Sequence, residues 1–141
     1  MTTRMSMRSF GAFCSVLGLT TLSMVAGGPV ASASASGCVD EGNTNSSCIR
    51  IHGSGLHVDW IQPGSLVAPF RTMRGSFTVS DSAGLIDKDT KSYTYKSYSP
   101  LPVYMWGDRI KIDKNFPHND KVCVTLHDGV YHPPACKTIH R

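Results

Sequence analysis

The sequence predicts an all-β fold, namely a small antiparallel β-sandwich or barrel-like domain stapled by two disulfides. Three observations predict it. Apolar and polar residues alternate along short segments after residue 35, which is the pattern of strands with one buried face. Gly, Pro, Asn and Asp residues separate these segments, and no useful run of helical periodicity occurs among them. Four cysteines remain in this part of the chain, an even number that suits two disulfides in an exported protein.

A secretory signal peptide is predicted at the N-terminus. Arg4 and Arg8 precede an apolar run from Phe10 to Ala26. Alternating Ala and Ser residues follow, and they provide Ala-x-Ala cleavage sites after Ala33 or Ala35. A positive segment, an apolar segment and a small-residue cleavage site in this order are typical of a leader that is removed on export.

We therefore expect residues 1–35 to form the signal peptide and residues 36–141 to form a single secreted β domain. An uncleaved membrane anchor is disfavoured, because polar residues interrupt the apolar run and a Gly-Gly-Pro tripeptide at 27–29 ends it. Spanning a bilayer takes roughly 20 consecutive apolar residues. Lipidation of Cys38 is disfavoured because a polar segment separates this cysteine from the run, and Ala35 stands where a lipobox usually has Leu.

The secreted domain carries only a small net charge. The leader removes two of the 14 Lys and Arg, so twelve remain against ten Asp and Glu, and the net charge is +2. Nucleic-acid binding usually requires a concentrated basic patch. We therefore expect no nucleic acid partner and no polybasic membrane-binding surface.

The cysteines of the domain are expected to form two disulfides in an oxidising compartment, once Cys14 leaves with the leader. They are Cys38, Cys48, Cys123 and Cys136. Three pairings are possible. The pairs Cys38–Cys48 and Cys123–Cys136 are favoured because each closes a short local loop, and a Cys48–Cys123 bridge between strands is the main rival. Each disulfide restricts the unfolded chain and stabilises the fold by about 2–4 kcal/mol.

Alternation and turn residues place the expected strands of the first half of the domain at 48–52, 56–60, 67–71 and 76–80. A Gly-Ser-Gly turn at 53–55 separates the first two. The Gln-Pro-Gly sequence at 62–64 is expected to end the second strand, because proline donates no ladder hydrogen bond. The third is a short edge strand that Pro69 limits.

The expected strands of the second half lie at 93–96, 103–106, 109–113, 122–127 and 136–139, which gives about eight short strands in the domain besides the edge strand at 67–71. The polar stretch Ser80–Lys91 is interpreted as a hairpin loop, and two prolines at 100 and 102 form a corner. Residues 115–120 form a further loop. Asp128-Gly129 is a strong signal for a two-residue hairpin turn.

The inward-facing residues of these strands sum to one plausible core. They are Ile49, Ile51, Leu56, Val58, Trp60, Phe77, Val79, Ile110, Ile112, Val122, Val124 and Leu126. The same phase places Cys48 and Cys123 opposite the core, where their disulfides would lie on the surface.

No motif predicts catalysis or metal binding. A Ser nucleophile would need an adjacent His and carboxylate, and no Gly-x-Ser-x-Gly elbow is present. The thiols are expected to be oxidised, and the four cysteines lack a Cys-x-x-Cys pair for zinc. The six histidines are interpreted as outward-facing polar residues of a sheet. We therefore expect a protein that is not an enzyme and that has no cofactor.

Candidate partner-binding residues lie in two places. In the aromatic-rich stretch 93–109, Tyr104 and Trp106 face solvent if the alternating Val103 and Met105 enter the core; burial of this strand on both faces is the alternative. Exposed Tyr and Trp are favoured at binding hot spots, and stacking on sugar rings is a second use of such a surface. The polar loop between the first two cysteines is the other place. The expected residues are Asp40, Glu41, Asn43, Asn45, Tyr98, Tyr104 and Trp106.

The order of these features resembles a known family. The domain begins with Cys38-Val-Asp and continues after a polar loop with Cys-Ile-Arg-Ile-His-Gly-Ser-Gly-Leu-His-Val at 48–58. It ends with Val-Cys-Val-Thr-Leu-His-Asp-Gly at 122–129 and Pro-Ala-Cys-Lys-Thr-Ile-His-Arg at 134–141. This arrangement is similar to small secreted proteins of filamentous soil bacteria, and in particular to the adaptor subunits of umbrella-shaped secreted toxin particles.

The resemblance implies a non-enzymatic adaptor in a secreted antibacterial toxin complex. Its partners would be secreted proteins: a large repeat-containing toxin protein on one surface and a lectin subunit on another. The polar loop from Cys38 to Cys48 and the edge from Tyr98 to Trp106 are the surfaces expected to bind them. A secreted protease or hydrolase inhibitor is the alternative function, and a small hydrolase or carbohydrate-binding protein is a third.

Overall fold

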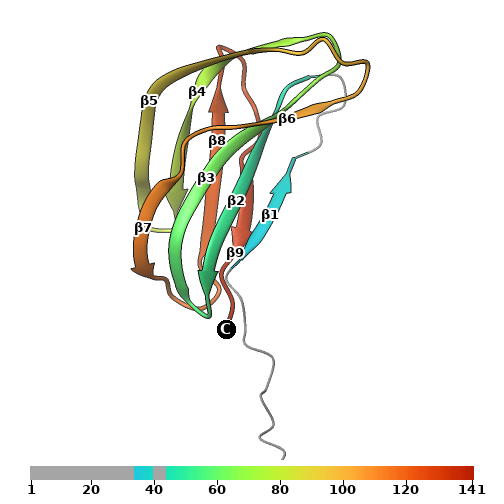
Figure 1. The fold of residues 1–141 in the computed structure, drawn as a ribbon. Helices are drawn as coiled ribbons and strands as arrows, with labels where there is room; N and C mark the ends of the chain where they lie inside the picture. The colour runs from blue at the N-terminus through green and yellow to red at the C-terminus, as the bar shows by residue number, and fades with distance from the viewer. Residues whose placement is uncertain (1–33, 40–43) are drawn as a thin grey trace, which may run out of the picture.

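The computed structural model describes residues 34–39 and 44–141, so the predicted signal peptide lies outside the described residues. The described chain is all-β and forms two antiparallel sheets that face each other (Figure 1). Its strands are β1 (Ala35–Cys38), β2 (Ser46–Ser54), β3 (His57–Val67), β4 (Thr72–Asp81), β5 (Gly84–Lys96), β6 (Val103–Trp106), β7 (Ile110–Asn115), β8 (Lys121–His127) and β9 (Ala135–Thr138). The predicted all-β fold with two disulfides is confirmed.

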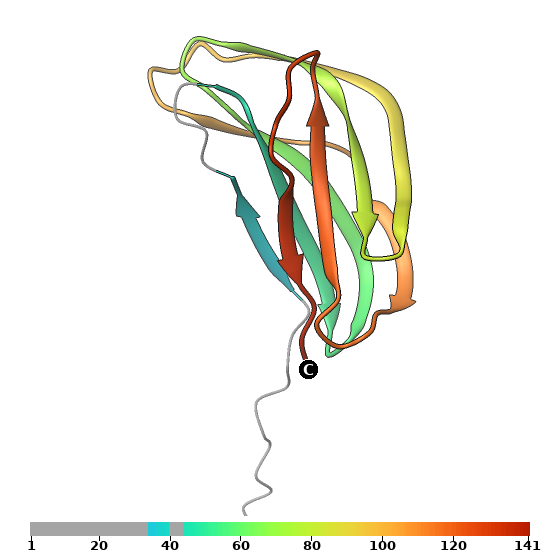
Figure 2. The same ribbon diagram turned by 180° about the vertical axis from the view of Figure 1, so that it is seen from behind.

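One sheet contains β1, β2, β3 and β6 in this order, and β7 also pairs with β3. The other contains β5, β4, β8 and β9 in this order, and β5 pairs with β4 alone among the described strands. The view from behind shows β8 and β9 beside each other, with β1 next to β9 (Figure 2). The strand β1 starts at Ala35, so cleavage of the predicted leader after Ala33 would leave it whole, whereas cleavage after Ala35 would remove its first residue.

The expected strand end at 62–64 is wrong, because β3 continues through Pro63 to Val67. The first part of β3 pairs with β7 and its last part pairs with β6. Pro63 lies at the change of partner, where its carbonyl accepts a hydrogen bond of 2.8 Å from the Gly107 N–H. Its missing N–H therefore falls where neither partner strand requires a donor. The expected edge strand at 67–71 is also wrong: β3 ends at Val67, and the residues that follow form a turn.

A β-bulge places Trp60 on the opposite side from the one expected. In the pairing of β2 with β3, His52 lies opposite Trp60 and Gly53 lies opposite Val58, so Asp59 is an extra residue. Because side chains alternate between the two faces, one extra residue reverses the phase of the rest of the strand. Ile61 therefore enters the core in place of Trp60. A side chain at Gly53 would overlap the His57 carbonyl oxygen, so this bulge requires glycine.

Two hairpins also differ from expectation. The stretch Ser80–Lys91 is not a long loop, since β4 and β5 meet in a tight turn where the Asp81 carboxylate accepts the N–H groups of Ala83 and Gly84 at 2.8 and 3.0 Å. Gly84 adopts a φ of 135°, which favours glycine. The Asp128-Gly129 pair opens a longer loop, 128–134, because two prolines at its end cannot donate to a ladder.

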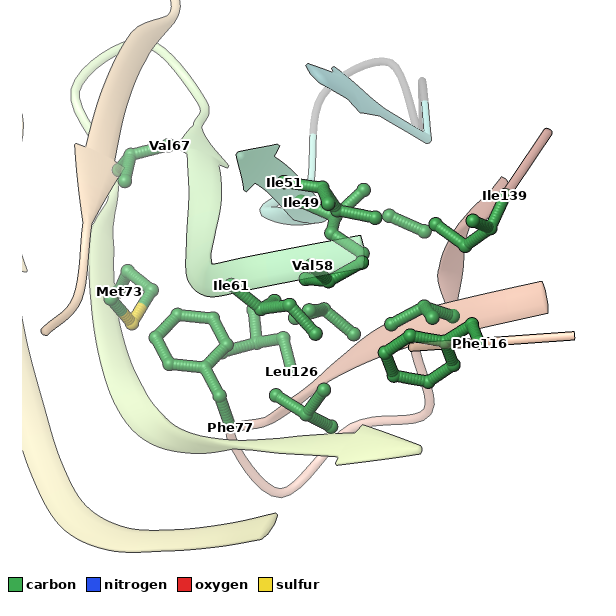
Figure 3. Close-up of a cluster of buried hydrophobic side chains, with 14 residues drawn as sticks. Ile49, Ile51, Val58, Ile61, Val67, Met73, Phe77, Phe116, Leu126 and Ile139 are labelled. Carbon is green, nitrogen blue, oxygen red and sulfur yellow. The ribbon is translucent and has the colours of Figure 1, made fainter. Parts of the chain in front are cut away.

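The core lies between the two sheets (Figure 3). Every expected core residue except Trp60 is buried or packs against the buried cluster. Sequence reasoning missed some members, which come from the second part of β3, from β4, from β9 and from the loops. They are Ile61, Val67, Met73, Phe116, Ala135 and Ile139.

The favoured disulfide pairing is confirmed. Cys38 lies directly opposite Cys48 in the β1–β2 ladder, and Cys123 lies directly opposite Cys136 in the β8–β9 ladder. The expectation that both bridges lie on the surface is wrong for Cys48, which is fully buried. Two disulfides are typical of a protein that folds in an oxidising compartment, outside the cytosol.

Candidate functional site

The outer face of the five-stranded sheet, on the side away from the core, carries a row of cationic and amide side chains. Arg50 on β2 lies opposite Gln62 on β3. Ile61 lies opposite Ile110, so the antiparallel register sets Arg109 beside Gln62 on the other side. The Gln62 amide donates a hydrogen bond of 2.8 Å to the Gly107 carbonyl, which holds this row to the turn between β6 and β7.

Trp106 stands on one side of this row. It pairs with Gly64, and a Cβ added to Gly64 would lie only 2.5 Å from the indole Cε3, so the indole leans across the glycine. Tyr104 stacks on Trp106 with ring centroids 6.1 Å apart, and the Arg50 guanidinium lies 4.2 Å from the indole centroid. The indole thus covers the neighbouring row of the sheet, which contains Cys48. This explains why Cys48 is buried although it lies on the outer face.

Trp60 stands on the other side of the row, because of the bulge at Asp59. The imidazole of His52 stacks on Trp60 with centroids 5.1 Å apart and an interplanar angle of 5°. The guanidinium of Arg109 lies 4.4 Å from the Trp60 centroid. The row with both arginines therefore lies between the two tryptophans, and each guanidinium contacts one of them.

We call this surface the tryptophan–arginine face; it consists of Arg50, His52, Trp60, Gln62, Tyr104, Trp106 and Arg109. Two shallow hollows of about 180 and 430 Å³ lie on it and share Ser36 and Arg50 as lining residues. Within the described residues, no carboxylate forms an ion pair with either arginine. The face can therefore accept an anionic group without breaking an existing ion pair.

Asp108 is adjacent to Arg109 in sequence but is engaged by another cation. Its Oδ2 lies 2.7 Å from the Lys91 Nζ, and its N–H donates a hydrogen bond of 3.1 Å to the Tyr93 hydroxyl. The hydrogen bond and the charge of Lys91 hold the pKa of Asp108 below its ordinary value, although desolvation opposes this shift.

Replacing Lys91 with methionine is expected to raise the pKa of Asp108 towards its ordinary value. Because the pKa is lowered in the folded protein, the pair stabilises the fold at pH values above the unfolded-state pKa, and this contribution disappears as the pH falls through the folded-state pKa. The carboxyl carbon resonance of Asp108, followed by NMR against pH, measures the change. Lys121→Met is the matched control and should leave this titration unchanged; an unmoved Asp108 pKa in Lys91→Met would contradict the assignment.

A second candidate surface lies at the end of the sandwich where three loops meet: the β3–β4, β5–β6 and β8–β9 connections (Figure 1). We call it the loop end. Its large apolar side chains are between 68% and 82% exposed: Phe70, Tyr98, Leu101, Val130 and Tyr131. The Phe70 N–H donates a hydrogen bond of 3.2 Å to the Ser99 carbonyl, which joins the first two loops. Arg71 and Val130 line one hollow of about 240 Å³, which brings the third loop to the same surface.

The sequence-predicted binding residues fall in different places. Asp40, Glu41 and Asn43 lie outside the described residues. Asn45 is buried rather than exposed: its amide donates to the Thr72 carbonyl at 3.2 Å and its oxygen accepts the Ala68 N–H at 3.2 Å. It therefore holds the turn between β3 and β4, because a buried amide needs hydrogen-bond partners.

Both members of the pair expected to be exposed on β6 lie on the outer face, since Met105 packs against the core, but Tyr104 is exposed whereas Trp106 is only partly exposed. Tyr98 is exposed too but belongs to the loop end. Sequence reasoning missed Arg50, Arg109 and the outward position of Trp60, because all three depend on strand register.

Three of the six histidines, His52, His57 and His132, contact carboxylates. His52 and His57 lie 3.0 and 3.2 Å from Asp59 and Asp113, respectively, near the turn that joins β2 and β3. His132 is buried rather than outward-facing, and its Nε2 lies 2.8 Å from the Asp128 Oδ1. In the part of the chain that the structure describes, no group of three or more His, Cys, Asp or Glu side chains is arranged to hold a metal ion.

The comparisons with known proteins leave the family open. No family model, no curated protein and no solved structure matches this chain. Within residues 34–39 and 44–141, no helix is long and apolar enough to cross a membrane. The functional interpretation therefore depends on the two surfaces described above and on the resemblance noted in the sequence.

Proposed function

We propose that the protein is a secreted, non-enzymatic binding subunit that docks on another secreted protein through the loop end. The resemblance to adaptor subunits of umbrella-shaped toxin particles gives this proposal its specific form. In that form the protein bridges a large repeat-containing toxin protein and a lectin subunit in an antibacterial complex. Two disulfides within a short domain support secretion.

The exposed apolar side chains of the loop end carry the proposal. Large exposed apolar patches on a monomeric protein commonly mark interaction sites. Aromatic side chains such as Tyr131 and Tyr98 are favoured at the centres of interfaces, because they bury much area at a low cost in side-chain entropy. Phe70 has a φ of 55°, an uncommon conformation for a non-glycine residue, and such conformations concentrate at functional sites.

An adaptor needs a second surface that remains free when the first is occupied. The tryptophan–arginine face satisfies this requirement, because it lies on the broad side of the five-stranded sheet and its side chains come from β2, β3, β6 and the segment before β7. Its chemistry is cationic and aromatic, whereas the loop end is largely apolar. Two surfaces of different chemistry support binding to two different partners.

One observation favours the second candidate function, a secreted protease or hydrolase inhibitor. Leu101 is exposed between Pro100 and Pro102, and its N–H donates a hydrogen bond of 3.0 Å to the Ser99 hydroxyl oxygen. A rigid loop that presents one apolar side chain suits the substrate-like mode of many inhibitors, because pre-organisation reduces the entropy lost on binding.

Substitution at the loop end is expected to weaken partner capture strongly. Immobilised mature protein should recover a large repeat-containing protein and a lectin from the culture medium of its own organism, identified by mass spectrometry. Replacing Tyr131 and Phe70 with serine should weaken the recovery of at least one of them by 30-fold or more, the effect of losing a hot spot worth about 2 kcal/mol.

Leu85→Ser is the matched control for this experiment. Leu85 is also a large exposed apolar residue, but it lies beside the turn between β4 and β5, away from the loop end. This variant should retain full capture. Equal capture by all variants would contradict the proposal, and recovery of a protease alone, lost in Leu101→Ser, would favour the inhibitor.

A further inference from the structure

We propose that the tryptophan–arginine face binds an acidic segment of a protein partner, whose carboxylates pair with Arg50 and Arg109. This inference depends on the proposed function, since it names the class of partner that the second surface recognises.

The two guanidinium groups are positioned before any partner arrives. Each lies within 4.4 Å of an indole centroid, and the Arg50 Nη1 lies 3.5 Å from the Gln62 Oε1. A free arginine loses much rotamer freedom when it forms an ion pair, and stacking on a ring removes part of this freedom in advance. A planar guanidinium that is already oriented can bind a carboxylate through two parallel hydrogen bonds.

The charge of these arginines is not satisfied within the described chain. The nearby carboxylates are already engaged: Asp108 pairs with Lys91, and Asp59 pairs with His52. Lys111, which lies opposite Trp60 in the ladder between β3 and β7, is itself paired with Asp113, whose Oδ2 lies 3.7 Å from the Lys111 Nζ. Within the described residues, this leaves Arg50 and Arg109 as the cations of the face that no carboxylate pairs with. The centre of the face is therefore positive although the whole domain is close to neutral, and an acidic partner is the complementary one.

The spacing of the arginines suits an extended polypeptide. Arg50 and Arg109 lie on opposite sides of β3 in one row, and neighbouring strands are about 4.8 Å apart, so their backbones are separated by about 10 Å. An extended chain advances about 3.3 Å per residue, so acidic residues three positions apart match this separation. The shallow hollows that share Ser36 and Arg50 leave room for such a segment.

The indole faces argue against sugar stacking as the main mode of recognition. Tyr104 and Arg50 occupy Trp106, and His52 and Arg109 occupy Trp60. A sugar ring that stacks on an indole needs a free indole face, whereas a carboxylate needs only the outward N–H edges of the guanidinium groups. The described contacts therefore favour a carboxylate-bearing peptide over a polysaccharide.

Tryptophan fluorescence can test this proposal directly, because the chain has only two tryptophans and both belong to the face. The mature, disulfide-bonded protein is titrated at low salt with a hexaglutamate peptide. We expect a saturable change in emission that Arg50→Gln and Arg109→Gln each weaken at least tenfold. Arg50→Lys should weaken binding nearly as much, because lysine keeps the charge but loses the planar fork.

Arg74→Gln is the matched control, since Arg74 is an exposed arginine on β4 of the other sheet, and it should change the affinity less than twofold. Thermal unfolding of every variant confirms that it is folded. An equal loss in Arg74→Gln, or saturable binding of polygalacturonate without binding of hexaglutamate, would overturn the inference. If hexaglutamate does not bind while capture through the loop end persists, the proposed function stands and this inference fails. If the unmodified protein neither binds hexaglutamate nor captures a secreted partner, both the proposed function and this inference fail.

Discussion

Replacing Phe77 with alanine is expected to lower the free energy of unfolding by about 3–5 kcal/mol. Phe77 is fully buried on β4, where it lies opposite Leu126 of β8 and packs against Tyr93 with ring centroids 5.7 Å apart. It is labelled among the side chains that fill the space between the sheets in Figure 3. Truncation removes apolar contacts and leaves a cavity, because the strands on both sides of β4 resist collapse.

Urea-induced unfolding followed by far-UV circular dichroism measures this loss. A domain of this size has a total stability of about 5–15 kcal/mol, so the variant should unfold at a much lower urea concentration. Leu85→Ala is the control, because Leu85 is exposed and its truncation should change the stability by less than about 0.5 kcal/mol. A loss below about 1 kcal/mol for Phe77→Ala would show that the sheets do not pack around this side chain.

Removing the Cys123–Cys136 disulfide is expected to lower the free energy of unfolding by about 2–4 kcal/mol. The two cysteines are 13 residues apart in sequence and lie directly opposite each other in the β8–β9 ladder. The bridge restricts the loop 128–134 in the unfolded chain, while β9 itself has only four residues and, among the strands that the structure describes, pairs only with β8. Without the bridge, this short edge strand is expected to detach first.

The double variant Cys123→Ala, Cys136→Ala tests this expectation by urea unfolding and by amide hydrogen exchange. Exchange should accelerate most at β9 and at its partner residues on β8. Treating the unmodified protein with a reductant is the second measurement, and it should cost more than the double variant because it also opens Cys38–Cys48. Unchanged exchange at β9 in the double variant would contradict the assigned role of this disulfide.

The parts of the fold that depend on local sequence were predictable. Alternation identified most of the core, because each strand buries one face. Both disulfides were identified because each favoured pair of cysteines closes a short loop. Predictions failed where one strand interacts with two partners or gains one residue. Pro63 was expected to end a strand. It is tolerated inside β3 because the partner of β3 changes there from β7 to β6, and the local sequence does not reveal this change. The bulge at Asp59 depends on the register of β2 with β3.

The candidate surfaces were predictable only in part, for the same reason. The position of Tyr104 and Trp106 on the outer face follows from alternation within β6. The stacking of Arg50 on Trp106 joins residues that are 56 positions apart, and no local pattern gives that distance. The loop end likewise gathers Phe70, Tyr98 and Tyr131 from three separate connections, which come together only when both sheets have formed.

The open edge of the four-stranded sheet has a consequence for behaviour at high concentration. The strand β5 is 13 residues long and pairs with β4 alone among the described strands, so its free N–H and C=O groups could template polymerisation. Register shifts at two points of its ladder bend it, and Lys91 and Lys96 place charge along it. A flat, uncharged edge would nucleate fibrils, and we expect this bent and charged edge to oppose such stacking.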